Sequence, residues 1–189
     1  MNYFELFDIP VGLQVNKNLL AQKYFELQKK FHPDFFTQAT EYEQAEALET
    51  SSQINKALKT LKNEDETIKY VLQLKGVLEE EEKYQLPPDF LMEVMELNEN
   101  LSVNSTEHIN SFEKNIYAGV KDIIENYNDA AITTENLLKV KEYYFKKKYL
   151  QRILERLADW CNIAAQFKAA HVAELVDATD SKSVVRKDV

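Results

Sequence analysis

The sequence has little of the chemistry that turns and sheets require. Its 189 residues include only three glycines and four prolines, whereas the helix formers Leu, Lys, Glu, Ala and Gln are plentiful. A sheet protein would need more turn residues than this. The sequence therefore predicts an all-α protein, and its 44% hydrophobic content is enough for one or two small domains with packed cores.

Other shortages exclude whole classes of function. The lone Cys161 excludes an internal disulfide and a cysteine metal cluster, and it fits a reducing compartment. No apolar run approaches the length of a membrane span and no targeting segment is recognisable, so we expect a cytoplasmic protein with no membrane partner. The net charge of −9 disfavours nucleic acid as a partner.

Catalytic and cofactor chemistry is equally sparse. No glycine-rich loop offers a phosphate cradle, so we expect no ATP hydrolysis by the chain itself. His32 and Asp34 lack a third ligand nearby, which disfavours a metal site. The sequence therefore predicts a protein that is not an enzyme and that carries no metal and no cofactor.

The pattern that is most informative lies between residues 17 and 36. Apolar residues recur there every three or four positions and predict one buried helix face over 17–31, with Asn16 as its N-cap; these residues are Leu20, Tyr24, Leu27 and Phe31. Pro33 disfavours helical geometry at His32, so the helix should end there and leave His32-Pro33-Asp34 in a short exposed loop. A second amphipathic helix, at about 41–62, should return antiparallel to the first.

The lysines of this first helix lie away from the apolar stripe. Lys23, Lys29 and Lys30 are expected to give it a basic outer face, which stands out because the whole chain is acidic. Periodicity alone favours a merely solvated helix face, and only the adjoining His-Pro-Asp loop favours a docking surface instead.

A basic helix that runs into His-Pro-Asp, with an amphipathic helix behind it, resembles the J-domain of the DnaJ family. Residues 3–7 (YFELF) are similar to the family's short first helix, and residues 53–61 (QINKALKTL) to its third. The resemblance implies that the motif stimulates the ATPase of a DnaK-class chaperone and that the basic helix docks on an acidic patch of that partner; the residues concerned are His32, Pro33, Asp34, Lys23, Lys29 and Lys30. Many family members have Lys or Arg after the Asp, where this chain has Phe35. The resemblance therefore implies no ionic contact from that position.

The second half of the chain predicts a separate bundle. A helix over 63–75 completes a J-domain of residues 1–76, and the acidic, proline-containing segment 77–87 reads as a linker. Three helices should follow, over about 88–101, from 104 through Tyr127, and from Thr133 or Thr134 onward, so that 88–170 forms a three-helix bundle. The final helix shows its clearest stripe at Ile153, Leu157, Trp160, Ala164 and Phe167, and Lys146 to Lys148 reads as a solvated face. Residues 171–189 lose the helical pattern and are expected to be disordered.

A J-domain joined to such a bundle, without a Gly/Phe-rich linker or a cysteine zinc module, resembles the HscB co-chaperones of iron–sulfur cluster assembly. The resemblance implies that the chain stimulates an HscA-type ATPase and delivers an IscU-type scaffold to it. Two alternatives stay open: a J-domain protein that serves a different client, and a structural helical adaptor whose His-Pro-Asp is incidental.

The helix predicted over 88–101 carries more apolar residues than one face needs. Its core stripe comprises Phe90, Val94, Leu97 and Leu101, and a second set lies off that stripe. This second set indicates a partner surface, an interdomain contact or a widened core stripe. The resemblance implies a scaffold-binding surface; its residues are Leu91, Met92, Met95, Glu96 and Glu99, with Phe145 on the last helix.

Overall fold

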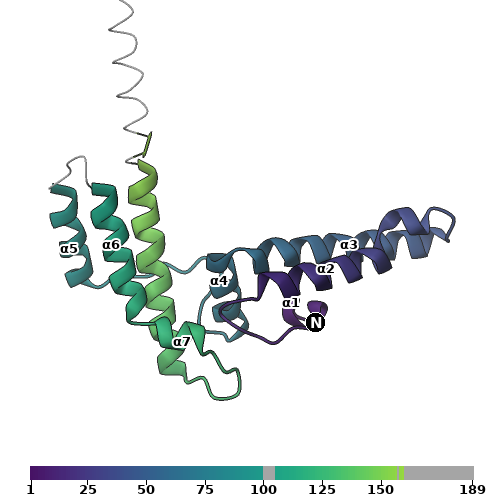
Figure 1. Ribbon diagram of the computed structural model, residues 1–189, viewed down its shortest axis with the longest axis horizontal. Helices are drawn as coiled ribbons and strands as arrows, with labels where there is room; N and C mark the ends of the chain where they lie inside the picture. The colour runs from purple at the N-terminus through teal and green to yellow at the C-terminus, as the bar shows by residue number, and fades with distance from the viewer. Residues whose placement is uncertain (100–104, 157, 160–189) are drawn as a thin grey trace, which may run out of the picture.

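The computed structural model describes residues 1–99, 105–156 and 158–159, and every regular element in this part of the chain is a helix (Figure 1). The predicted all-α class is confirmed. The elements in chain order are α1 (Tyr3–Phe7), α2 (Lys17–Phe31), the 3₁₀ helix η1 (Pro33–Phe36), α3 (Glu41–Lys62), α4 (Glu64–Leu74), α5 (Pro88–Glu99), α6 (Ser105–Ala118), α7 (Lys121–Glu125) and an unlabelled last helix (134–156). None of the described helices is long and apolar enough to cross a membrane.

Helices α2 and α3 form the long antiparallel hairpin that projects sideways in Figure 1. Asn16 caps α2 as predicted, because its Oδ1 accepts hydrogen bonds from the amides of Asn18 and Leu19. Between the two helices, Asn55 of α3 accepts hydrogen bonds from Tyr24 (3.0 Å) and Gln28 (3.3 Å). The hairpin's bounds, 17–31 and 41–62, are those that the sequence predicts.

Helices α1 and α4 pack at the base of the hairpin. The rings of Tyr3 and Tyr70 stack with their centroids 4.4 Å apart, and the Tyr70 hydroxyl accepts a hydrogen bond from the Tyr3 amide at 2.9 Å. Gly76 follows α4 with φ = 67°, a backbone conformation that glycine adopts without steric cost. The predicted stop after α4 is therefore confirmed.

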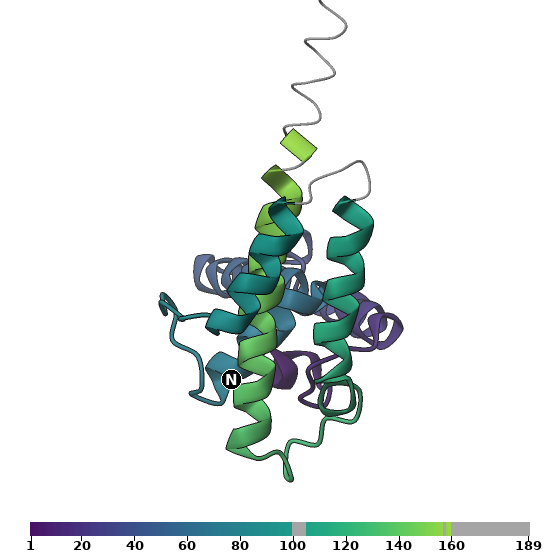
Figure 2. The same cartoon turned by 90° about the vertical axis from the view of Figure 1, so that its left-hand side faces the viewer.

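Helices α5 and α6 and the last helix stand side by side as an upright bundle (Figure 2). Its upper part has a core of its own, in which Phe90 and Val94 of α5 meet Ile109 of α6 and Leu150 of the last helix. Phe90 stacks on Phe112 at 5.7 Å between ring centroids. The predicted three-helix bundle is thus present. Leu101, Leu157 and the residues from 160 onward, the predicted tail included, lie outside the described residues.

One predicted helix is interrupted. The sequence predicts a continuous helix from 104 through Tyr127, but the structure has a turn at Gly119 and Val120 between α6 and α7, closed by a 3.0 Å hydrogen bond from the Val120 amide to the Tyr117 carbonyl. Ile109 above the break packs in the upper core, whereas Val120 below it packs in a second core. The apolar spacing continues across the break because both segments bury one face, each against a different set of partners.

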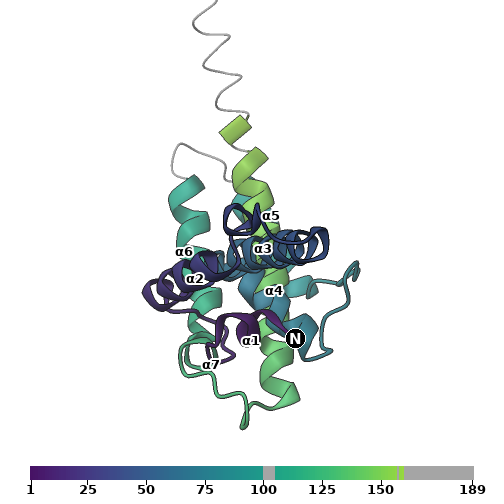
Figure 3. The same ribbon diagram turned by 90° about the vertical axis from the view of Figure 1, so that its right-hand side faces the viewer.

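The second core joins the two halves of the molecule. It contains buried residues of the hairpin and of α4, such as Ile54 and Val71, together with Val120, Val140 and Tyr143 from the bundle. Figure 1 shows α4 between the hairpin and the last helix, and Figure 3 views the same region from the tip of the hairpin. The hairpin and the lower bundle therefore share one continuous apolar core.

Candidate partner-binding surfaces

The His-Pro-Asp motif lies at the far end of the hairpin. Pro33 starts η1, as suits a residue with no amide proton to satisfy, and His32 is its N-cap. The segment predicted as a loop is thus one turn of 3₁₀ helix. His32 Nδ1 accepts a hydrogen bond from the Asp34 amide at 3.3 Å and lies 3.6 Å from Asp34 Oδ2. The Asp34 side chain is nevertheless 84% exposed, so its carboxylate is accessible from outside.

The return from η1 to α3 is held by polar contacts. The Gln44 side chain of α3 donates hydrogen bonds to the carbonyls of Thr37 (3.4 Å) and Ala39 (3.0 Å). Thr40 and Glu43 form a capping box at the start of α3, and these hydrogen bonds lower the pKa of the Glu43 carboxyl. The motif is thus carried on a turn whose exit is fixed.

The three lysines predicted to dock are not equivalent. Lys29 and Lys30 are exposed, and their ammonium groups lie 4.5 Å and 5.1 Å from the ring centres of Phe25 and Phe31. Lys23 instead pairs with Asp8 at 2.8 Å, and only 25% of its side chain is exposed. This contact raises the pKa of Lys23 and lowers that of Asp8. Lys29 and Lys30, hereafter the tip lysines, are the two whose charge faces solvent.

The predicted scaffold surface lies on the outer side of α5. Met92 and Met95 are 58% and 60% exposed, and Glu96 is exposed as well. Leu91 is half-buried beside the upper core. Phe90 and Val94 fill that core, as the predicted stripe requires. The methionines therefore lie off the core face; the side chain of Glu99 lies outside the described residues.

Phe145 has a different environment. It is half-buried, and its ring stacks almost parallel on Tyr84 of the 77–87 segment, with centroids 4.5 Å apart and an interplanar angle of 2°. It also meets Tyr144 edge-on at 5.3 Å. The described contacts of Phe145 thus point toward the segment before α5 and do not join it to Met92 or Met95.

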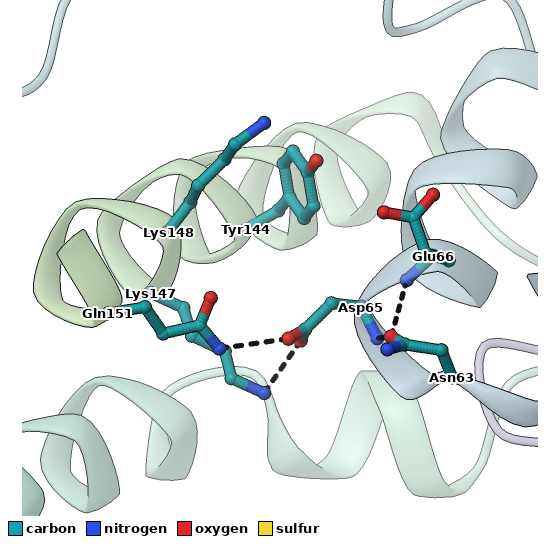
Figure 4. Close-up of a pocket in the computed structure, with 7 residues that line it drawn as sticks. All are labelled: Asn63, Asp65, Glu66, Tyr144, Lys147, Lys148 and Gln151. Atoms are coloured by element: carbon teal, nitrogen blue, oxygen red, sulfur yellow. Dashed lines mark hydrogen bonds and ion pairs between the residues drawn. The ribbon is translucent and has the colours of Figure 1, made fainter. Parts of the chain in front are cut away.

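The last helix also supplies a cluster that sequence reasoning missed. Lys147 lies 2.7 Å from Asp65 of α4 and 3.8 Å from Glu113 of α6, with only 17% of its side chain exposed. Gln151, one turn further on, donates a hydrogen bond to Asp65 at 2.9 Å. Figure 4 shows both side chains converging on Asp65, beside the Asn63 cap of α4. This cluster ties α4 to two helices of the bundle, α6 and the last helix.

A second lysine fastens the 77–87 segment. Lys141 is buried, donates a hydrogen bond to the Val77 carbonyl at 2.8 Å and pairs with Glu82 at 2.6 Å. The hydrogen bond from Lys141 lowers the pKa of Glu82. The segment predicted as a linker is therefore packed along the last helix. Lys141 and Lys147 are called the junction lysines below.

The sequence contained a signal for Lys147. Val140, Tyr143, Lys147 and Leu150 recur at helical spacing, so Lys147 falls on the same helix face as three buried residues. The prediction that Lys146 to Lys148 form a solvated face is wrong for the first two. Lys146 pairs with Glu142 at 2.6 Å and is 21% exposed, and Lys147 is enclosed by carboxylates. Only Lys148 is exposed.

A helical hairpin that presents His-Pro-Asp at its tip is the mark of a J-domain protein. Comparison with known proteins identifies the branch. Residues 86–158 match the family model described as the HSCB C-terminal oligomerisation domain. The co-chaperone protein HscB homolog of Shewanella amazonensis is 33% identical over 174 residues, covering 84% of this chain and 98% of the relative. The chain belongs to the HscB family of co-chaperones.

Other relatives match over less of their length or are known as structures. The HscB homolog of Vibrio cholerae serotype O1 (strain M66-2) is 42% identical over 102 residues, which span 53% of this chain and 60% of that relative. The chaperone HscB structure from Vibrio cholerae is 30% identical with a TM-score of 0.55, covering 83% of this chain and 99% of that one. The human co-chaperone HscB crystal structure is 27% identical with a TM-score of 0.67, covering 84% and 81%.

Proposed function

We propose that this protein is a co-chaperone that binds two partners at once during iron–sulfur cluster assembly. One partner is a DnaK-class ATPase of the HscA type, which the hairpin tip engages and stimulates. The other is an IscU-type scaffold, which the outer side of α5 binds. The protein delivers the scaffold to the ATPase and performs no catalysis of its own.

The single observation that carries this proposal is the exposure of Asp34. Its carboxylate is 84% exposed on a turn whose start and exit are fixed by His32 and Gln44. A carboxylate held in this way is suited to accept paired hydrogen bonds from a partner arginine. The exposed tip lysines nearby supply positive charge, which favours fast, salt-sensitive association with an acidic surface.

The surface of α5 supports the second half of the proposal. Exposed Met92 and Met95 next to an exposed Glu96 give an adaptable apolar patch beside an acidic residue. Because α5 already fills the upper core with Phe90 and Val94, the methionines are not needed for packing. Such a patch on a helix is suited to bind another protein.

The arrangement of the two surfaces explains why one chain would carry both. The hairpin tip and α5 lie at opposite ends of the molecule (Figure 1), so both partners have room to bind together. The shared core and the junction lysines connect the two ends. Holding the scaffold and the ATPase on one body raises the local concentration of each for the other.

The test is the steady-state ATPase rate of an HscA-type chaperone, measured alone, with this protein, with an IscU-type scaffold and with both. We expect this protein to raise the rate and the scaffold to raise it further only when this protein is present. An unchanged rate at saturating concentrations of this protein would contradict the proposal. Stimulation that the scaffold does not alter would indicate a J-domain protein for a different client.

A further inference from the structure

Two phenylalanines beside the His-Pro-Asp motif are exposed without a structural reason. Among the phenylalanines that the structure describes, Phe25 and Phe35 are the ones whose rings face solvent, at 60% and 70% exposure. Neither contributes to the two apolar cores, whereas neighbouring Tyr24 and Phe31 pack against the core. With most of each ring in water, neither residue gains the stabilisation that burial of a phenylalanine side chain gives.

The two rings belong to one continuous strip. Phe25, Lys29 and His32 are spaced by four and three residues, which places them on one side of α2. The Lys29 ammonium lies 4.5 Å from the centre of the Phe25 ring, and the His32 ring meets Phe35 edge-on at 6.0 Å. The docking strip, defined as Phe25, Lys29, His32 and Phe35, therefore has a phenylalanine ring at each end, with the Lys29 ammonium and the His32 imidazole between them, and it runs from α2 to η1 at the tip.

The composition of the docking strip specifies the surface that fits it. Cationic groups require carboxylates opposite them, and rings of this size gain most when they enter a recess and lose their contact with water. Aromatic anchors surrounded by polar contacts are the usual residues that dominate binding energy at protein interfaces. Charged contacts alone would leave Phe25 and Phe35 unused.

We propose that Phe25 and Phe35 are aromatic anchors that enter an apolar recess rimmed by carboxylates on the DnaK-class ATPase. This inference rests on the proposed function and names the chemistry of its partner surface. Phe35 occupies the position after Asp34, so an apolar anchor stands where an ionic contact is absent. The docking of this chain therefore depends on apolar contact as well as on charge, and part of its affinity persists at high salt.

The experiment compares the full-length protein with the double variant Phe25→Gln/Phe35→Gln in the chaperone ATPase assay. Glutamine is a good helix former and keeps the surface polar. We expect the concentration for half-maximal stimulation to rise about tenfold, with an unchanged maximal rate and an unchanged salt dependence. The matched control is Leu138→Gln, which removes an exposed apolar residue from the last helix (51% exposed) and should change neither quantity.

A second pair of variants separates apolar contact from charge. Lys29→Ala/Lys30→Ala should weaken the salt dependence of half-maximal stimulation, because it removes two charges and leaves both rings. Phe35→Lys should strengthen that salt dependence, because a cation replaces an apolar anchor. Thermal unfolding followed by circular dichroism should give the same midpoint for all of these variants, since every substituted side chain is exposed.

The outcomes distinguish this inference from the proposed function. If the wild-type protein stimulates the ATPase and the double glutamine variant matches it at every concentration, the inference is overturned and the proposed function stands. A lowered maximal rate with an unchanged half-maximal concentration also overturns it, because the rings would then act after docking. If the wild-type protein does not stimulate the ATPase at all, both fail together.

Discussion

The lysines at the hairpin tip and those at the junction have the same side chain but differ in their exposure to solvent and in their contacts. The tip lysines, Lys29 and Lys30, are exposed, and their described contacts are aromatic rings of their own helix. The junction lysines, Lys141 and Lys147, are enclosed, and each lies within 2.7 Å of a carboxylate from another segment. Within the described residues, then, the charges of the junction lysines are paired with carboxylates that hold the fold together. The charges of the tip lysines face solvent.

This contrast explains how the chain combines a packed junction with an accessible tip. Taking a lysine out of water is costly unless carboxylates and carbonyls surround it. When a lysine is surrounded in this way, removing it or one of its carboxylate partners leaves the charge of the remaining group uncompensated. An exposed lysine has no such dependence, so it can be changed with little effect on folding.

The largest effect is expected for a substitution at the hairpin tip. Asp34→Asn keeps the shape of the tip and removes the negative charge, so we expect stimulation of an HscA-type ATPase to be lost. The free energy of unfolding should change by less than about 0.5 kcal/mol because Asp34 is exposed. ATPase rates and urea titrations measure the two quantities. A stimulated rate equal to that of the wild type would contradict the role of the tip.

The next prediction concerns a junction lysine, where we expect an effect on stability. Lys147→Met keeps the apolar stem but leaves Asp65 and Glu113 without their shared cation. We expect the free energy of unfolding to fall by about 1–2 kcal/mol, between the values for exposed and fully buried pairs. The control is Lys148→Met, whose side chain is exposed. A double-mutant cycle with Asp65→Asn should give a coupling energy of about 1 kcal/mol, and no coupling would contradict the assignment.

A third prediction tests whether α5, like the tip, can be altered with an effect on partner binding and none on folding. Leu91→Ala with Met95→Ala removes the half-buried Leu91 side chain and the exposed Met95 side chain from α5, so affinity for an IscU-type scaffold should fall by about tenfold. Helicity measured by circular dichroism should stay the same, because Phe90 and Val94 still fill the upper core. Titration calorimetry gives the affinity. Unaltered affinity of the double variant would count against this surface, and Leu138→Ala is the matched exposed control.

The smallest expected effect is the acid sensitivity of the junction. The contacts of Glu82 with Lys141 and of Asp129 with Lys75 lower the pKa of both carboxyls in the folded state. A carboxyl whose pKa is lower in the folded than in the unfolded state stabilises the fold fully above its unfolded-state pKa, near pH 4. This stabilisation is lost as the pH falls through the folded-state pKa. Urea midpoints should therefore decrease on acidification. The urea midpoint of Glu82→Gln should fall less on acidification than that of the wild type. Equal slopes of midpoint against pH for the two proteins would contradict this prediction.

Much of the fold could be predicted because its boundaries depend on neighbours in sequence. Asn16 and Pro33 fix the two ends of α2 through their own backbone chemistry. The same Pro33 placed Asp34 at an exposed turn, and apolar spacing separated the core residue Phe90 of α5 from exposed Met95. Each of these inferences needs only a few consecutive residues.

The failures share the opposite cause. The apolar spacing runs on through the break at Gly119 and Val120, because Ile109 of α6 is buried in the upper core and Ile124 of α7 in the lower one. Lys147 lies in a basic run that has no carboxylate beside it in sequence, and its partner Asp65 is 82 positions away (147 − 65). Phe145 likewise turns toward Tyr84, which the sequence places in a linker. Each required knowing which distant segments meet.

The sequence by itself determined the helices of the hairpin, the corner at Pro33 and the all-α class, because caps, prolines and apolar periods act over a few residues. Only the tertiary structure decided which lysines are free and which are enclosed. The charge of a lysine is the same everywhere along the chain, but its solvation depends on the carboxylates that folding brings to it. The difference between a tip open to partners and a junction closed on itself is therefore a property of the assembled core.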